Sequence, residues 1–240
     1  MEELKNKLVN WIRQQVEMAG TGGVVFGLSG GIDSSVTAVL CKESLKNRCI
    51  ALIMPCNSIK KDIKDVYLII NKFSIPCKEV VLDEVYNNLI SILPKITLDK
   101  KSYQIAKANL KPRLRMLTLY YFANSLNYLV VGTGNRSELA VGYFTKYGDG
   151  GVDILPLSNL TKSQVRELAK YLNIPKRIIE KPPSAGLWKG QTDEGEMGVT
   201  YNQIDKYIIS GRIEKSFKEK IEEMIIKSVH KRKTPTIPDF

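Results

Sequence analysis

The sequence predicts an α/β protein built on a doubly wound parallel sheet, with helices on both faces. Short β-branched and aromatic runs such as 24–28 and 49–54 are typical of strands that are buried on both sides. Segments with helical periodicity separate these runs, and the connections are too long for hairpins. Repeated strand-then-helix order with long connections favours parallel strands covered by helices.

The first half of the chain supplies most of this alternation. Leu4, Leu8, Trp11, Ile12 and Val16 share one helical face, and the glycines at 20, 22 and 23 end that helix. In chain order we expect a helix over 2–19, a strand over 24–28, a helix over 34–46, a strand over 49–54, a helix over 62–73, a strand over 78–82 and a helix over 84–93.

The second half is expected to be less regular. A long helical stretch over about 102–126 and a strand over 128–131 come first, and helices follow over 161–172, 200–209 and 214–229. Residues 132–151 hold six glycines, and 181–198 is rich in proline, glycine and charge. Long irregular segments inside a compact domain are usually functional. We expect one domain over 1–240, with a C-terminal helical segment and tail from about residue 200.

Composition excludes several classes of protein. No apolar run approaches the ~20 residues of a membrane helix, and the amino terminus lacks a signal-peptide core. The four cysteines, Cys41, Cys49, Cys56 and Cys77, form no CxxC pair, which favours buried thiols in a reducing compartment. We therefore expect a cytoplasmic protein. The net charge of +11 indicates an anionic partner without choosing between nucleic acid, nucleotide and phosphate.

The most informative segment, FGLSGGIDSS, covers residues 26–35, where the first strand ends and a helix begins. Ligands bind beyond the carboxyl ends of strands in open α/β sheets. Gly30 and Gly31 let main-chain N–H groups approach an anion, the serines add hydroxyl donors, and the helix N-terminus adds a positive dipole end. The segment is therefore expected to hold phosphate.

Asp33 stands where a Walker A loop would carry lysine. A carboxylate beside phosphates needs a cation between them, since two unit charges 4 Å apart repel by roughly 4 kcal/mol at an effective dielectric of 20. Mg²⁺ suits this position because it binds one or two carboxylates together with phosphate oxygens. The alternative is a Gly-Ser turn capped by an aspartate.

The SGGIDSS sequence resembles the S-G-G-x-D-S loop of the N-type ATP pyrophosphatases, which include amide-forming synthetases and tRNA-thiolating enzymes. The segments 130–169, 111–116, 181–205 and 230–235 resemble NAD synthetases. The resemblance implies a Rossmann-like adenine nucleotide alpha hydrolase fold. It also implies a ligase that adenylates deamido-NAD with ATP and Mg²⁺, and then forms NAD from ammonia with release of AMP and pyrophosphate.

The resemblance also implies site residues. The expected ATP contacts are Gly27, Leu28, Ser29, Gly30, Gly31, Ile32, Asp33, Ser34, Thr133, Lys162 and Ser184. The expected Mg²⁺ ligands are Asp33 and Glu138. The expected deamido-NAD contacts are Arg113, Lys146, Asp153, His230 and Lys231. Three of these residues also have a plainer interpretation: Glu138 as a first-turn acid, Lys162 as a solvated helix-start lysine and His230 as a solvated tail residue.

Ammonia is mostly ammonium at neutral pH, so a group must hold the cation and take its proton. Our hypothesis is that Asp149, in the KYGDGG segment, acts as this acceptor or general base. Free ammonia, or ammonia from a separate glutaminase or amidase partner, is the expected nitrogen source. A homodimer is expected from family habit and from the amphipathic first helix and the helices of the second half.

Three alternatives compete with this interpretation. A tRNA-modifying ATP pyrophosphatase would use the positive charge for the RNA backbone, but the cysteines lack the paired spacing of sulfur-transferring members. A hydride-transfer enzyme would need a third glycine in GTGNRS. A nucleic-acid-binding module would interleave aromatic and basic residues, whereas the aromatic residues here fall mainly in apolar runs. We expect no nucleic-acid or membrane partner.

Overall fold

The structure is a computed structural model that describes residues 1–58, 60–94, 96, 99–188 and 190–240. Its strands are β1 (Gly23–Gly27), β2 (Cys49–Ile53), β3 (Cys77–Glu79) and β4 (Tyr128–Val131). Its longer helices are α1 (Glu2–Met18), α2 (Ile32–Leu45), α3 (Lys60–Phe73), α4 (Asp83–Ile92), α5 (Lys100–Ala108), α6 (Leu110–Leu126), α8 (Lys162–Tyr171), α11 (Tyr201–Ser210) and α12 (Lys215–Lys227). The shorter ones are α7 (Arg136–Val141), α9 (Lys176–Ile179), α10 (Asp193–Met197) and the 3₁₀ turn η1 (Val229–Lys231).

The four strands form one parallel sheet in the order β3-β2-β1-β4. β1 lies at its centre, where Val25 pairs with Ile50 of β2 on one side and Val130 of β4 on the other. Successive strands move outward from β1 to β2 to β3, and the chain then returns to add β4 on the opposite side of β1. The strand order therefore reverses between β1 and β4.

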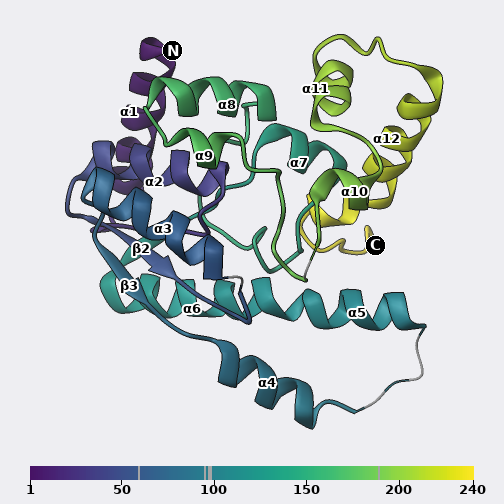
Figure 1. The fold of residues 1–240 in the computed structure, drawn as a ribbon, viewed down its shortest axis with the longest axis horizontal. Coiled ribbons are helices and arrows are strands. Elements are labelled where there is room, and N and C mark those ends of the chain that lie inside the picture. The colour runs from purple at the N-terminus through teal and green to yellow at the C-terminus, as the bar shows by residue number, and fades with distance from the viewer. Residues whose placement is uncertain (59, 95, 97–98, 189) are drawn as a thin grey trace.

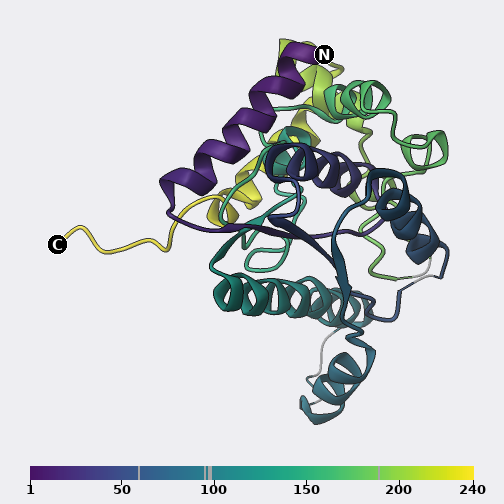
Figure 2. The ribbon, with the colours of Figure 1, turned by 90° about the vertical axis from the view of Figure 1, so that its left-hand side faces the viewer.

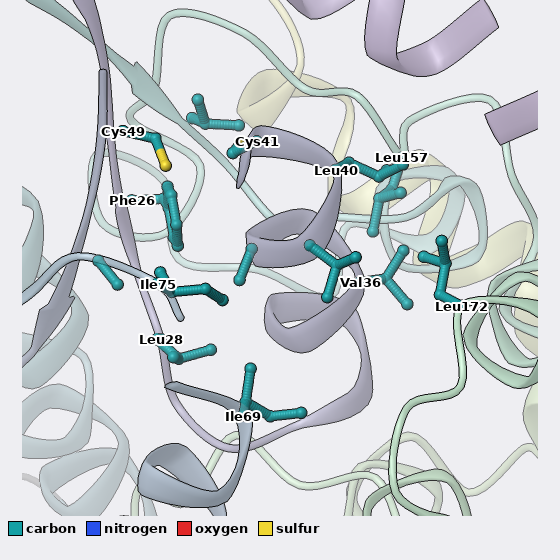
Figure 3. Close-up of a cluster of buried hydrophobic side chains, with 14 of the residues drawn as sticks. Phe26, Leu28, Val36, Leu40, Cys41, Cys49, Ile69, Ile75, Leu157 and Leu172 are labelled. Atoms are coloured by element: carbon teal, nitrogen blue, oxygen red, sulfur yellow. The ribbon is translucent and has the colours of Figure 1, made fainter. Parts of the chain in front are cut away.

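Alternate residues of β1 face opposite layers, as the period of two of a strand requires. Val24 and Phe26 join a buried cluster with α1, α2, α3 and α8, whereas Val25 joins one with α4 and α6. Figure 1 and Figure 2 show α2 and α3 on one face of the sheet and α6 on the other. Figure 3 shows the first cluster, with Phe26 and Leu28 facing Val36 and Ile69. The predicted doubly wound α/β fold is confirmed.

The C-terminal helices form a third cluster of buried side chains beside the sheet. Tyr201, Ile204 and Ile221 are fully buried there and pack with Val141 of α7 and Met197 of α10. Figure 1 shows α10, α11 and α12 grouped at one end of the molecule, next to α7. This cluster places α11 against α7 and α8, which carry side chains of the candidate site.

The predicted helical stretch over 102–126 is confirmed as helical, but it is divided at Asn109. Two helices, α5 and α6, meet at Asn109 and lie almost in line in Figure 1. The cause is Pro112, whose ring would clash with the carbonyl of Ala108 in a continuous helix. In the first turn of α6, the N–H that proline lacks would have no helical partner anyway.

The predicted strand over 78–82 is also shorter than expected. β3 spans only Cys77–Glu79, although Val80 and Leu82 still donate hydrogen bonds to the carbonyls of Ile53 and Pro55. Pro55 has no N–H, so it cannot donate a bond in return and regular pairing ends. The remaining predicted strands and helices, apart from 102–126, are confirmed to within about two residues at each end.

The segments expected to be irregular contain short helices. Residues 132–151 include α7, and residues 181–198 include α10. α7 begins with a capping box between Asn135 and Glu138 and ends at Gly142 in the left-handed conformation. α10 is capped by Thr192 and ends at Gly198 with φ +64°. Side-chain caps and left-handed glycines thus delimit helices of only five or six residues.

The cysteines behave as expected of small core side chains. Cys41, Cys49 and Cys56 are buried, Cys77 is half-buried, and all four are free thiols. Burial raises the pKa of the Cys49 thiol to about 11, which keeps it protonated at neutral pH. Over the residues that the structure describes, none of the helices is both long enough and apolar enough to span a bilayer.

Candidate active site

The candidate site lies at the carboxyl end of the sheet, where the strand order reverses. The segments that leave β1 and β4 diverge there, because β1 continues into α2 on one face and β4 continues towards α7. Such a reversal opens a crevice that is the usual ligand site of an open α/β sheet. Side chains from both segments, and from the start of α8, converge in it.

The segment after β1 is shaped for an anion. Gly30 has φ +77°, and a Cβ there would lie 2.7 Å from the main-chain oxygen of Asp62, so only glycine fits. The hydroxyls of Ser29 and Ser34 lie 3.0 Å apart, and Ser34 donates to the carbonyl of Gly31. Gly31 begins α2 without a side-chain cap. The first-turn N–H groups and the positive end of the helix dipole therefore face the crevice.

A triad forms where Asp33 of this segment meets Glu138 and Lys162; the lysine is buried and the two carboxylates are mostly buried. The Lys162 Nζ atom lies 2.5 Å from Asp33 Oδ2 and 3.2 Å from Glu138 Oε1. It also lies 4.6 Å from the centre of the Tyr201 ring, within cation–π range. The Lys162 side chain is only 2% exposed. The solvated helix-start interpretation of Lys162 is therefore wrong, because the ammonium is buried against two carboxylates.

Capping interactions place the triad. Asn135 caps α7, accepts from the Glu138 N–H, and donates from Nδ2 to Asp33 Oδ1 at 2.9 Å. Thr161 caps α8 in a second capping box, with Gln164, so that Lys162 becomes the first residue of that helix. Local helix-start chemistry thus brings Glu138 and Lys162 to the same point from two different helices.

Tyr201 and Asp193, from α11 and α10, complete the polar network. The Tyr201 hydroxyl lies 3.1 Å from Glu138 Oε1 and 2.9 Å from Asp193 Oδ2, within donating distance of both. Tyr143 donates to Asp193 and, at 2.8 Å, to Glu196. Sequence reasoning missed Asn135, Tyr201 and Asp193. The Asn-x-x-Glu spacing could have revealed Asn135, whereas the other two depend on contacts between distant segments.

Burial and mutual charge set the protonation of this network. Burial would lower the pKa of the Lys162 ammonium, but the carboxylates of Asp33 and Glu138 outweigh it and raise that pKa. Burial raises the pKa of Glu138 to about 7, although Lys162 opposes the rise. Burial also raises the pKa of Asp193, against hydrogen bonds from Tyr201 and Tyr143. The ammonium therefore stays charged at neutral pH.

A second set of side chains surrounds residues 142–151. We call Arg113, Lys146, His230 and Lys231 the basic group. Lys231 Nζ donates to the carbonyls of Gly142 and Phe144, both at 2.8 Å. Lys146 Nζ donates to the His230 carbonyl at 2.7 Å, and Arg113 donates to the Lys146 carbonyl at 3.3 Å. The structure thus brings together four of the five residues expected to contact deamido-NAD.

Asp149 lies in the same region, at an exposed position of its turn. Its carboxylate accepts from the Thr145 N–H at 2.9 Å, and Gly148, Gly150 and Gly151 donate main-chain hydrogen bonds within the turn. Desolvation by nearby protein atoms raises the pKa of Asp149, whereas the hydrogen bond from Thr145 and the charge of Lys231 oppose the rise.

The remaining expected contacts, Asp153, Ser184 and Thr133, belong to other segments. Asp153 is engaged within the fold, where Oδ2 accepts from the Val130 N–H at 2.7 Å and Oδ1 accepts from the Tyr120 hydroxyl. Ser184 donates to the Gln191 carbonyl in the segment between α9 and α10. Lys181, at the start of that segment, pairs with Asp62 and Asp65 of α3. Thr133 is half-buried just after β4.

The donor set fits a divalent cation. Asp33 and Glu138 already turn one oxygen each towards a shared positive centre, the Lys162 ammonium. Two carboxylates, with phosphate and water oxygens for the other positions, match the coordination of Mg²⁺. Among the described residues, no three histidine, cysteine or acidic side chains gather as a metal cage.

Comparison with known proteins decides the family. The model of the NAD synthase family matches residues 4–235. The chain belongs to the NAD synthase family. The chain is 50% identical to an NH3-dependent NAD+ synthetase from Carboxydothermus hydrogenoformans. The alignment covers 99% of this chain and 97% of that relative. This membership favours the NAD synthetase prediction over the tRNA-modifying alternative.

Two solved structures resemble this NAD synthase family member along its whole length. The structure of NMN synthetase from Francisella tularensis superposes with a TM-score of 0.94 at 42% identity, covering 100% of this chain and 98% of that one. An NH3-dependent NAD synthetase from Campylobacter jejuni superposes with a TM-score of 0.81 at 30% identity, covering 99% and 98%.

Proposed function

We propose that the chain is an ammonia-dependent NAD synthetase that amidates the nicotinate carboxylate of deamido-NAD at the expense of ATP. One observation carries the proposal. In a chain of the NAD synthase family, the anion-binding segment after β1 and the Asp33–Glu138–Lys162 triad meet at the reversal of strand order. ATP, deamido-NAD and ammonia are the substrates.

The first step transfers the adenylyl group of ATP to the substrate carboxylate and releases pyrophosphate. Residues 27–34 hold the leaving phosphates through main-chain N–H groups and serine hydroxyls, and Thr133 and Ser184 bind the rest of the nucleotide. Lys162 moves from its carboxylate partners to the charge that develops on the leaving pyrophosphate. Asp33 and Glu138 would hold Mg²⁺, which would supply charge neutralisation there when bound.

The second step forms the amide. Arg113, Lys146, Asp153, His230 and Lys231 hold the deamido-NAD half of the intermediate near the 142–151 turn. Asp149 accepts one proton from ammonium, and the resulting ammonia attacks the acyl carbon. The C–N bond forms, the bond to the AMP oxygen breaks, and the second proton passes to water. A carboxylate with a raised pKa suits this acceptor role, because its basicity lies closer to neutrality.

A direct assay tests the proposal. The protein is incubated with ATP, MgCl₂, deamido-NAD and ammonium chloride, and NAD, AMP and pyrophosphate are measured. Equal amounts of the three products are expected. Without ammonium, only the adenylated intermediate and an equal amount of pyrophosphate should form. Production of ADP and phosphate instead would reject the α–β cleavage that the site is proposed to perform.

Nicotinate mononucleotide is a second candidate substrate for the same assay, because one comparison favours it. The NMN synthetase structure from Francisella tularensis has the higher TM-score of the two neighbours, 0.94 against 0.81. Nicotinate mononucleotide carries the same reactive carboxylate as deamido-NAD without its AMP half. Comparison of kcat/KM for the two substrates decides which one this chain prefers.

The chain is proposed to work as one domain over 1–240 and as a homodimer in the cytoplasm. One domain is supported because Asp33 near the N-terminus and Tyr201 in the C-terminal helices belong to a single hydrogen-bonded network. A second copy is supported by α6, which exposes Leu117 and Tyr121 on its surface. Sedimentation velocity tests the dimer. A separate glutaminase or amidase is a proposed ammonia source.

A further inference from the structure

Asp205 of α11 is a buried carboxylate outside the expected set of site residues. It is 4% exposed, and among the described residues the hydrogen bonds that it accepts come from the starts of α7 and α8. Oδ1 accepts from the Ser137 hydroxyl, and Oδ2 accepts from the Ser163 N–H at 2.9 Å and from the Ser163 hydroxyl at 2.6 Å. Burial of an ionised carboxylate is tolerated only with such partners.

The partners of Asp205 are sequence neighbours of the triad. Ser137 directly precedes Glu138, and Ser163 directly follows Lys162. Ser137 Oγ also accepts from the Lys162 N–H at 3.0 Å, so Asp205, Ser137 and the adjoining Lys162 and Ser163 close a ring of hydrogen bonds. The carboxylate therefore joins the helix that carries Glu138 to the helix that carries Lys162.

Two further features fit this role. A negative charge at the N-termini of α7 and α8 is favoured by both helix dipoles. Tyr201 lies four residues before Asp205 in α11, so the two side chains share one face of that helix. Tyr201 reaches Glu138 itself, whereas Asp205 reaches the main-chain segments behind the triad. One helix face thus holds the triad from two directions.

We propose that Asp205 is a positioning residue for the metal–nucleotide site, because its carboxylate sets the separation of Glu138 and Lys162. The inference rests on the proposed function, since it assumes that this triad receives Mg²⁺ and ATP. Removal of the carboxylate is expected to weaken binding of the metal with its nucleotide, while binding of deamido-NAD at the basic group is unaffected.

Asp205→Asn is the primary variant. An amide can still accept from Ser163 through its oxygen, but its NH₂ group then faces Ser137, whose hydroxyl proton loses its acceptor. The negative charge is lost, and the Ser137 hydroxyl can no longer donate into the ring. Loss of a group that orients metal ligands typically weakens metal binding by about 10- to 100-fold.

The experiment measures Mn²⁺ binding by the loss of its free EPR signal, in the presence of α,β-methylene-ATP, which the protein cannot cleave. We expect the Mn²⁺ dissociation constant of Asp205→Asn to rise by about tenfold or more. In steady-state assays the Mg²⁺ concentration for half-maximal activity rises in parallel, and the KM for deamido-NAD stays within twofold.

Ile221→Val is the matched control. Ile221 is fully buried in the cluster that packs α11 and α12, so its truncation loosens the same helices without removing a hydrogen bond. Its Mn²⁺ constant should equal that of the wild type at temperatures where both are folded. An equal shift in Ile221→Val, or an Asp205→Asn constant within twofold of wild type, overturns the proposal.

Ser163→Ala keeps the proposal testable if Asp205→Asn does not fold. It removes only the hydroxyl bond to Asp205 and is expected to weaken Mn²⁺ binding by about threefold. An unchanged constant in this variant contradicts the inference. Failure of the proposed function is seen separately, as a wild-type protein that forms no NAD, whereas the Mn²⁺ measurement needs no turnover.

Discussion

The triad and the basic group hold their cations in different ways. Lys162 is 2% exposed and is paired with two carboxylates, each within 3.2 Å. Lys146 and Lys231 donate to main-chain carbonyls, and Arg113 and His230 are exposed. The first arrangement is a mostly buried network in which the ammonium is already paired with carboxylates, so it must exchange partners to act. The second keeps its net positive charge for an incoming anion, because carbonyls fix the ammonium groups without cancelling their charge.

The largest expected effect comes from removing the Lys162 ammonium, which should lower both the stability and the activity of the protein. Lys162→Met should destabilise the fold by about 3 kcal/mol, because it leaves two mostly buried carboxylates facing each other without a counter-ion. It should also lower kcat/KM for ATP by about 10³-fold. Urea unfolding and steady-state kinetics measure the two effects.

Lys170→Met is the control for this comparison. Lys170 pairs with Glu167 on the surface of the same helix, with both side chains more than half exposed. The unfolding free energy of Lys170→Met should differ from that of the wild type by no more than about 0.5 kcal/mol, and its kinetic constants should match those of the wild type. Similar losses in both lysine variants would show that burial of the triad is unimportant.

The next effect tests the chemistry assigned to the 142–151 turn. Asp149→Asn should slow amidation by about 10²-fold and leave adenylation unchanged, because only the second step needs a proton acceptor. A rapid-quench experiment follows pyrophosphate release and NAD formation separately. Equal slowing of both steps would reject the assignment of Asp149.

The same residue gives a pH dependence with a definite sign. Desolvation raises the pKa of Asp149, so its protonated form persists to higher pH than that of an ordinary aspartate. The protonated carboxyl cannot accept a proton from ammonium, and amidation therefore falls as the pH is lowered through this pKa. With the free ammonia concentration held constant, the acid limb should disappear in Asp149→Asn.

A smaller effect is expected at the contact between Tyr201 and the triad. Tyr201→Phe keeps the ring over Lys162 but removes the hydroxyl that lies between Glu138 and Asp193. We expect about a tenfold rise in the KM for ATP and a loss of about 1 kcal/mol in unfolding free energy. If the KM for ATP stays within twofold of wild type, Tyr201 does not contribute to the nucleotide site.

The smallest change falls in the basic group. Lys146→Ala should raise the KM for deamido-NAD by about fivefold, with no change in the KM for ATP, because one of several cations is lost. Its unfolding free energy should change by no more than about 0.5 kcal/mol. A rise in the KM for ATP as well would show that the two regions do not bind separate substrates.

The sequence predicted the sheet better than the site. The strands at 24–28, 49–54 and 128–131 are contiguous apolar runs, and the polar segment after the first of them indicated an anion site from local chemistry alone. The break at Asn109 was missed because the periodic pattern continues through Pro112, although proline itself carried the signal.

The site depends on contacts that no local pattern encodes. Lys162 looks like a solvated helix-start lysine until α7 and α2 supply carboxylates on either side of it. Glu138 and Asp33 are 105 residues apart in the sequence, and only the family resemblance linked them. Tyr201, Asp193 and Asp205 come from helices whose packing against α7 and α8 is decided by the C-terminal cluster of buried side chains.

Gly30 lies where the candidate crevice meets α3. It lies close to the first turn of α3, since even a Cβ at Gly30 would meet the Asp62 carbonyl, and the Asp62 carboxylate accepts a hydrogen bond from Lys181 at the start of the segment that bears Ser184. A shift of the turn at Gly30 would therefore displace the start of α3, because there is no room between them. Binding of a triphosphate at the turn would then also affect the position of Lys181 and of the segment that follows it.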